Sequence, residues 1–278
     1  EHDEHPAKRG EAGHTTFELF QVLMVHPQKA PGAKHYEEEL RLLWVKEYLD
    51  DNGSPKPINV LRGMKLYQGM LTSREQDGLL RELHDVLLLA MSRTYPYDKE
   101  DDHTYLPSTY THTGLGRKTL QFGCAFESRN TVKHPHGIRV DRKVAAMPVC
   151  LTNTLMKMHN CGLFSAEACP DSAAVEFFSE GDCQPPHIEH HDFDRPVFTL
   201  SLGSTQRIVM GQKIHTREAG KFVSDVELAL PTGSVLARKD HSANVPKLAV
   251  PCVSAPRVGI TFRRIKPRFL QQQQGHAS

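Results

Sequence analysis

Short apolar runs, separated by Gly, Pro and Ser, dominate the chain from residue 173 onward. Six of them are "AAVEFFS", "PVFTLSLGS", "QRIVMGQKI", "DVELALP", "GSVLARK" and "RVGITFRRI". An earlier run, "RKTLQFG" (Arg117–Gly123), has the same character. Runs of this length that are rich in β-branched and aromatic residues are typical of strands. No helical pattern interrupts the later runs, so we predict antiparallel sheets of a sandwich or jelly roll.

Helical periodicity is confined to the first half of the chain. It predicts one helix over His35–Asp51, where Leu and Trp recur at helical spacing. A second is predicted over Glu75–Ser92, with Ser73 as its N-cap and Gln76 completing a capping box. A third is predicted over Pro148–Asn160, with Pro in its first turn. The fold class predicted from these patterns is mainly β with flanking helices.

Composition along the chain suggests three segments. Residues 1–59 begin with about 33 residues that are rich in His, Lys, Glu, Gly and Pro, and they include the turn-rich linker "NGSPKP" (Asn52–Pro57) near their end. We expect them to form a partly disordered extension with one helix. Residues 60–265 are expected to form the domain, and residues 266–278, which include "QQQQGHAS", a disordered tail.

Charge and cysteine content narrow the functional classes. The 278 residues include 34 basic and 33 acidic ones, a formal net charge of +1, which excludes wholesale electrostatic attraction to nucleic acid. The six cysteines form no C-x-x-C pair, and no apolar run is long enough to span a membrane. We therefore expect a reduced, soluble intracellular protein, in the nucleus, the cytoplasm or both.

The stretch "SEGDCQPPHIEHHDFDRP" (Ser179–Pro196) carries the clearest candidate chemistry. Side chains two apart in a strand point to the same face, so His187 and Glu189 project together while Ile188 faces the core. A His-x-carboxylate pair at a strand start, with a distant third ligand, fits the facial triad of non-haem iron oxygenases. The alternative is a polar, histidine-rich loop, because an H-x-E triplet alone is common by chance.

The run "FFSEGDCQPPHIEHHDFDRP", followed by "LPTGSVLARK", "HSANVPKLAVPCV" and "RVGITFRRI", resembles the AlkB family of iron- and 2-oxoglutarate-dependent dioxygenases. It is most similar to the plant members that demethylate N6-methyladenosine in messenger RNA. The resemblance covers roughly Val60–Ile265 and is strongest from Ala173 onward. It implies a double-stranded β-helix (jelly-roll) core, Fe(II) as metal, 2-oxoglutarate as cosubstrate, and oxidative demethylation of N-methylated adenine in RNA.

The resemblance also implies roles for individual residues. His187 matches the first iron ligand, and Glu189 takes the place usually held by Asp. Arg257 and Arg263 match the arginine pair of the family, of which the first binds the distal carboxylate of 2-oxoglutarate. Strand-edge salt bridges are the alternative for both arginines. Phe178 takes the place of a cosubstrate-binding Tyr and keeps its ring without the hydroxyl.

Some positions depart from the family pattern. Leu248 holds the place of the second histidine ligand and cannot bind iron, so His241, seven residues earlier, is an alternative third ligand. Glu176 replaces an Asn and puts a carboxylate where the cosubstrate is already anionic. His190 and His191 are expected outside the ligand set, either behind the ligands or facing solvent.

Three functional hypotheses follow. The first is an active RNA demethylase of the AlkB type. The second is an AlkB-like jelly roll that has lost turnover and recognises RNA or a partner protein. The third is a cupin-like metal protein of another substrate class, which the six-residue spacing of Arg257 and Arg263 disfavours.

Local features bear on RNA binding. Basic groups occur at Arg62 and Lys65, at Arg117 and Lys118, at Arg139 to Lys143 and at Arg263 to Arg268. The loop Tyr95–Gly116 adds four tyrosines (Tyr95, Tyr97, Tyr105 and Tyr110) as candidates to stack an extruded base. Dense Asp and Glu in the same loop oppose phosphate binding, and a solvated excursion is the alternative.

Overall fold

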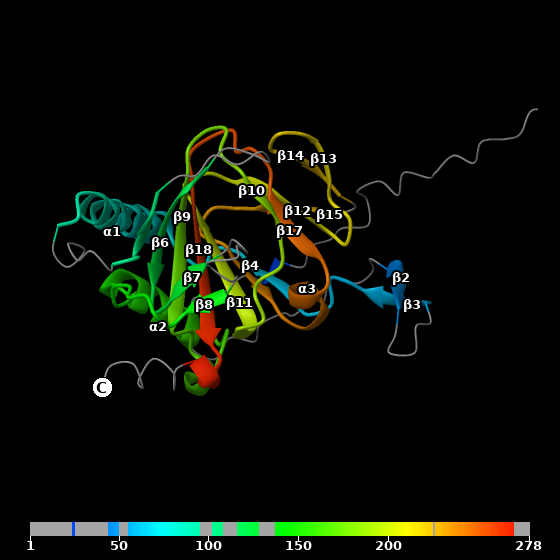
Figure 1. The fold of residues 1–278 in the computed structure, drawn as a ribbon, viewed down its shortest axis with the longest axis horizontal. Coiled ribbons are helices and arrows are strands. Elements are labelled where there is room, and N and C mark those ends of the chain that lie inside the picture. The colour runs from blue at the N-terminus through cyan, green and yellow to red at the C-terminus, as the bar shows by residue number, and fades with distance from the viewer. Residues whose placement is uncertain are drawn as a thin grey trace, which may run out of the picture.

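The computed structural model describes residues 24–25, 44–49, 55–94, 102–107, 116–127, 137–224 and 226–269. Within these ranges strands predominate, and two longer helices lie to one side of them (Figure 1). No helix of the described part is both long and apolar enough to cross a bilayer. All six cysteines are free thiols.

An eight-stranded sheet forms the larger layer. Its order is β1 (Met24–Val25), β4 (Met64–Tyr67), β16 (Val235–Arg238), β11 (Phe193–Leu202), β18 (Arg257–Ile265), β9 (Ser172–Phe178), β6 (Lys118–Phe122) and β5 (Tyr105–Leu106). Only β1 and β4 of this sheet pair in parallel. Residues of the N-terminal extension thus add a strand to the sheet of the domain.

A four-stranded antiparallel sheet forms the second layer. Its order is β10 (Gln184–His187), β17 (Lys247–Val250), β12 (Gln206–Gly211) and β15 (Val226–Leu230). Along the chain β9, β11, β16 and β18 belong to the larger sheet, while β10, β12, β15 and β17 belong to the smaller one. This repeated crossing between two facing sheets is the double-stranded β-helix, so the predicted jelly roll is confirmed.

Shorter elements lie around the two sheets. They are the pairs β2 (Trp44–Leu49) with β3 (Pro55–Asn59), β7 (Ala125–Glu127) with β8 (Gly137–Arg139) and β13 (His215–Glu218) with β14 (Lys221–Val223), the 3₁₀ turn Ala166–Ala168, and the helix α3 (Asp240–Asn244). The predicted later strands all form, and α3 is a single short helical turn between β16 and β17.

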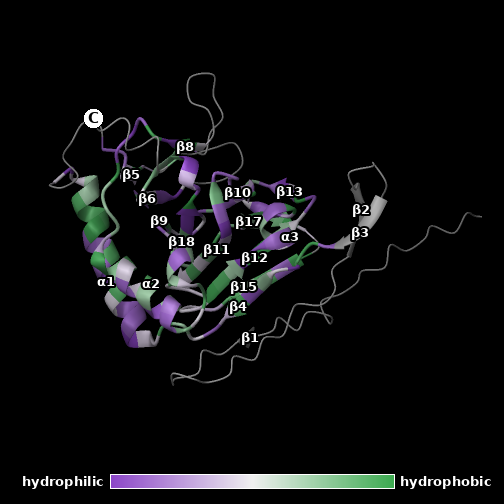
Figure 2. Cartoon of the chain, turned by 90° about the horizontal axis from the view of Figure 1, so that it is seen from below, coloured by the Kyte–Doolittle hydropathy of each residue, from purple (hydrophilic) through white to green (hydrophobic). Residues whose placement is uncertain are grey.

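Two amphipathic helices cover the outer face of the larger sheet. They are α1 (Ser73–Met91) and α2 (Val149–Asn160), and they lie side by side in both ribbon views (Figure 2). Their apolar faces share one buried cluster with the sheet, which includes Leu83 and Leu151 from the helices and Leu120 and Phe262 from the strands. Burial of this apolar area is the main favourable term that holds helices to sheet.

The N-terminal cap of α1 lies one residue earlier than predicted. Thr72 Oγ1 accepts a hydrogen bond from the Glu75 amide, and a Glu75 carboxylate oxygen accepts one from the Thr72 amide at 2.7 Å. This reciprocal pair is a capping box. Thr72 and Glu75 therefore replace the predicted Ser73 and Gln76, because the first helical turn begins at Ser73.

The helix predicted over His35–Asp51 is wrong where the structure describes it. Residues 44–49 form strand β2 instead, which pairs antiparallel with β3. Trp, Val and Tyr favour strands, and the Asn-Gly between the two segments favours a tight turn. Pairing with a neighbouring strand therefore outweighs the helical spacing, and the predicted linker contributes β3.

Candidate metal and cosubstrate site

The register of two adjacent strands decides what faces His187. It ends β10, and its direct partner across the antiparallel pair with β17 is Leu248. Antiparallel partners lie within direct contact distance of each other. A metal ion bound by His187 would need a third protein ligand from this facing position. The position is instead held by the aliphatic side chain of Leu248.

A small cavity of about 20 Å³ lies between the two sheets at this point, with room for about one water molecule. Four predicted site residues line it: His187, Glu189, Arg257 and Phe178. Leu248 and the buried Arg238 also line the cavity. The structure thus brings the predicted residues together, while Arg263 reaches the cavity only through Glu189.

The Glu189 carboxylate lies between three basic side chains. Arg238 Nη2 is 3.6 Å from its Oε1, Arg263 Nη1 is 3.6 Å from its Oε2, and His187 Nε2 is 3.7 Å from Oε1. Burial by itself would raise the pKa of Glu189, but His187 and the charges of Arg263 and Arg238 hold this pKa well below its usual range. Both carboxylate oxygens are therefore already directed at guanidinium groups.

Arg238 is the site residue that the sequence analysis missed. Its side chain is 2% exposed and lines the cavity from β16. Burial lowers the pKa of Arg238, and the neighbouring Glu189 opposes this shift. The signal was present in "SVLARK": Leu236 and Arg238 are two apart in a strand whose residues are all buried, which places a cation at an inward position.

Arg257 lies on the last strand with its guanidinium inside the fold. Its Nη2 donates to Ser201 Oγ at 3.3 Å, and its Cζ lies 5.7 Å from the centre of the Phe178 ring. Burial lowers the pKa of Arg257 to about 10, and Glu176 opposes the shift. Within the described part of the chain, its Nε and Nη1 atoms have no hydrogen-bond partner. These donors suit a carboxylate, so the 2-oxoglutarate role of Arg257 stays a prediction.

Arg263 lies six residues further along the same face of β18. Its guanidinium stacks on Phe193, 4.2 Å from the ring centre, and pairs with Glu189. The pairing is internal to the fold rather than at a strand edge, because the Arg263 side chain is 6% exposed. Arg263 thus balances the negative charge of Glu189 and helps to orient its carboxylate.

Neighbouring side chains also balance the negative charge of the Glu176 carboxylate. Arg117 forms an ion pair with it, and the Gln184 amide donates to both of its oxygens, at 3.1 and 3.3 Å. The Phe178 ring centre lies 5.9 Å from Arg117 Cζ and 5.7 Å from Arg257 Cζ. The repulsion expected between Glu176 and an anionic ligand is therefore reduced by these partners.

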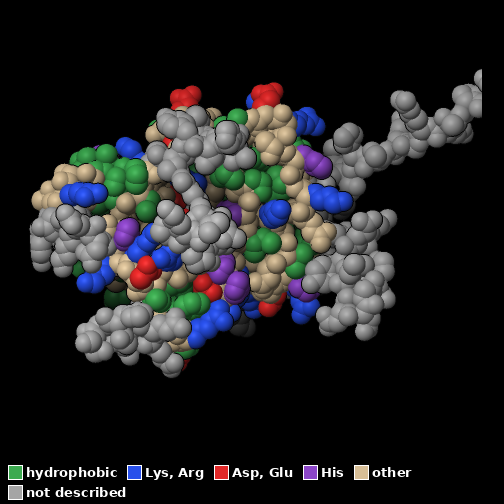
Figure 3. Space-filling view, viewed as in Figure 1, with side chains coloured by type: hydrophobic (Ala, Val, Ile, Leu, Met, Phe, Trp, Pro, Cys, Tyr) green, Lys and Arg blue, Asp and Glu red, His purple; other side chains and the backbone are tan. Residues whose placement is uncertain are grey.

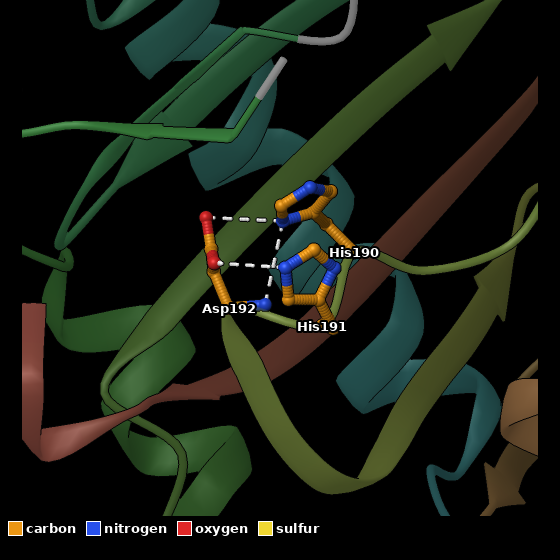
Figure 4. Close-up of side chains that lie close together, drawn as sticks. All are labelled: His190, His191 and Asp192. Atoms are coloured by element: carbon orange, nitrogen blue, oxygen red, sulfur yellow. Dashed lines mark hydrogen bonds and ion pairs between the residues drawn. The ribbon is translucent and has the colours of Figure 1, made fainter. Parts of the chain in front are cut away.

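A second group of candidate ligands lies outside the cavity. Donor atoms of His190, His191 and Asp192 lie within 4.8 Å of one another (Figure 4). Asp192 is already engaged: it accepts from the Ile138 amide at 3.1 Å and from Arg268 at 3.0 Å, and it lies 3.0 Å from His190 Nδ1. His191 is 75% exposed, in line with the solvent-facing position expected for it.

His241, the alternative third ligand, lies on α3. Its Nδ1 is 3.2 Å from the backbone oxygen of Asn59, and it does not line the cavity. The cavity thus offers His187 and Glu189 as donors, with Leu248 in the third place and two guanidinium groups beside the carboxylate. A facial iron triad needs three protein donors and open positions. The residues present therefore do not fit that metal centre.

Comparison with known proteins gives the following relatives. No family model matches the chain. It is 32% identical over 247 residues to RNA demethylase ALKBH9B of Arabidopsis thaliana, covering 87% of this chain and 48% of that protein. It is 23% identical over 211 residues to RNA demethylase ALKBH10B of the same plant, covering 76% and 36%. The chain thus spans about half the length, or less, of these curated relatives.

Among solved structures, that of OsALKBH1 has a TM-score of 0.49 and 15% identity, covering 73% of this chain and 98% of that one. A Pseudomonas putida prolyl-4-hydroxylase has a TM-score of 0.42 and 13% identity, covering 73% and 93%.

The strand order, the His-x-Glu pair that starts at the last residue of β10 and the buried arginine on the last strand define a double-stranded β-helix of the 2-oxoglutarate dioxygenase class. Within that class the chain belongs to the AlkB family and is a homologue of the plant RNA demethylases. Members of the family typically use Fe(II) and 2-oxoglutarate.

Proposed function

We propose that this chain is an RNA-binding member of the AlkB family that recognises RNA containing N-methylated adenine and does not itself carry out the iron-dependent oxidation. The observation that carries this proposal is the pairing of His187 with Leu248. Leucine offers no donor atom, so a metal would have two protein ligands. Loss of a ligand leaves coordination to water and weakens binding strongly.

RNA is the ligand class that the relatives support, since both are named RNA demethylases. A messenger-RNA ligand is consistent with the nucleus or the cytoplasm as the site of action. Three of the four predicted tyrosines lie outside the described residues. The fourth, Tyr105, is partly buried against the main apolar cluster, so we assign no base stacking to it.

The basic groups suggest few phosphate contacts. Arg139 pairs with Asp141, Arg142 with Glu127, and Arg268 with Asp192. Figure 3 shows Lys and Arg side chains scattered singly or in small groups over the face it presents. A cation that already pairs with a carboxylate of the same chain binds phosphate less well, so RNA binding should depend on a small number of contacts.

Oxidative demethylation of N6-methyladenine in RNA is the second candidate function. It is favoured by the presence of His187, Glu189 and Arg257 in one cavity. In that case Fe(II) and 2-oxoglutarate would supply the oxidation, and the chain would supply two ligands and a carboxylate-binding arginine.

One experiment separates the two candidates. Fluorescence anisotropy measures binding of the chain to labelled single-stranded RNA with one adenine or one N6-methyladenine. Mass spectrometry of the digested RNA then follows the methylated nucleoside after incubation with Fe(II), 2-oxoglutarate and ascorbate. We expect binding that favours the methylated RNA and no loss of the methyl group. Loss that requires 2-oxoglutarate would establish the demethylase, and absence of RNA binding would overturn the proposal.

A further inference from the structure

Arg238 holds a position that needs explanation. It is among the largest fully buried side chains of the described structure, and it lies on an interior strand between β4 and β11. Its Nε and Nη1 atoms have no hydrogen-bond partner within the described residues. Among the described residues, Glu189 is its ion-pair partner. A buried guanidinium destabilises the fold unless a carboxylate balances its charge. Burial of Arg238 and burial of Glu189 therefore each require the other residue.

The charges around the cavity are strongly one-sided. Four guanidinium groups, those of Arg117, Arg238, Arg257 and Arg263, surround two carboxylates, those of Glu176 and Glu189. These six side chains together carry a net charge of +2. A divalent metal ion beside Glu189 would double this excess in a region of low dielectric constant, where like charges repel most.

We infer that the Arg238 guanidinium is the resident cation of this site and takes the place of a metal ion as the partner of Glu189, next to His187. Leu248 and Arg238 act together: Leu248 removes a donor, and Arg238 supplies the positive charge that Glu189 needs. The unaltered chain therefore binds no divalent metal in this cavity. The inference rests on the proposed function and deepens it. It explains how the fold keeps the buried Glu189 carboxylate paired when no metal ion is bound.

Metal binding by a small set of variants tests this inference without any measurement of activity. The probe is Mn(II), with the free ion counted by electron paramagnetic resonance. The proteins are the unaltered chain, Leu248→His, and Leu248→His combined with either Arg238→Met or Arg238→Lys. Met removes the charge at similar length, whereas Lys keeps it. Thermal unfolding confirms that each variant is folded.

We expect no binding to the cavity in the unaltered chain and weak binding in L248H. The R238M/L248H variant should bind one Mn(II) at least about tenfold more tightly than L248H, the usual scale for groups around a metal ligand. R238K/L248H should bind as weakly as L248H. Adding His187→Ala should abolish the gain, whereas adding His241→Ala should not change it.

Two results would overturn the inference. One is stoichiometric Mn(II) binding by the unaltered chain that His187→Ala removes. The other is equally tight binding by L248H and R238M/L248H, which would show that the Arg238 charge does not matter. Binding that His191→Ala removes belongs to the separate group of His190, His191 and Asp192 in Figure 4 and is subtracted first. If the Met variant does not fold, the His187→Ala comparison in the unaltered chain still decides. RNA binding is measured separately, so failure of the inference is distinct from failure of the proposed function.

Discussion

Glu189→Gln removes the negative charge between two buried guanidinium groups and leaves the side-chain volume almost unchanged. At 3.6 Å and an effective dielectric constant of about 20, each pair attracts by about 4–5 kcal/mol. Desolvation offsets much of this attraction, yet removing one partner of a buried pair costs about 3–5 kcal/mol, because the remaining charge stays buried. We expect E189Q to lower the free energy of unfolding by about 3 kcal/mol, a large share of the total for a domain.

Urea unfolding followed by far-ultraviolet circular dichroism measures this loss. Glu176→Gln is the matched control, since Glu176 lines the same cavity but its partner Arg117 is 24% exposed. Its loss should be about 1 kcal/mol, in the range of partly exposed pairs. Equal losses for the two variants, or a loss below about 1 kcal/mol for E189Q, would refute the reasoning that Glu189 balances buried arginines.

Acid sensitivity gives the same pair a second signature. The pKa of Glu189 is lower in the folded chain than its ordinary value of 4.5. The unfolded chain therefore takes up a proton first as the pH falls. The stabilisation from Glu189 is complete above about pH 4.5 and declines below it. The stability difference between the unaltered chain and E189Q should shrink over this range, and a difference independent of pH would contradict the assignment.

Three further outcomes are expected. Thr72→Ala removes the cap of α1 and should cost about 1 kcal/mol in urea unfolding, whereas Ser73→Ala should cost much less; the reverse would contradict the observed cap. Arg195 donates to the backbone oxygens of Glu189, His190 and Phe193. Arg195→Ala should therefore speed amide exchange in residues 189–193 by about tenfold or more, at about 1.5 kcal/mol per charged hydrogen bond, without affecting α1. RNA affinity should fall gently with salt, with a logarithmic slope near −3 for about four phosphates; a slope near −6 would indicate a far larger basic surface.

Local patterns of the sequence determined most of the strands and both long helices. The alternation in runs such as "RVGITFRRI" reports which side chains face inward, because successive residues of a strand point to opposite faces. The same rule placed His187 with Glu189, and the resemblance to the AlkB family added Arg257 and Phe178, which line one cavity in the structure. The resemblance alone put Leu248 in the place of the second histidine ligand, and the strand register pairs it with His187.

Tertiary structure alone decided what these residues contact. Arg238 and Glu189 are far apart in the sequence and meet because β16 and the segment after β10 face each other across the two sheets. Residues 44–49 form a strand rather than a helix because β3 pairs with them. The periodicity of one segment predicts which face a side chain points to. It does not predict which residue of another element contacts that side chain. The energy of an ion pair or a strand pair depends on both members. Arg238 could therefore be identified as the partner of Glu189 only from the packing of the two sheets.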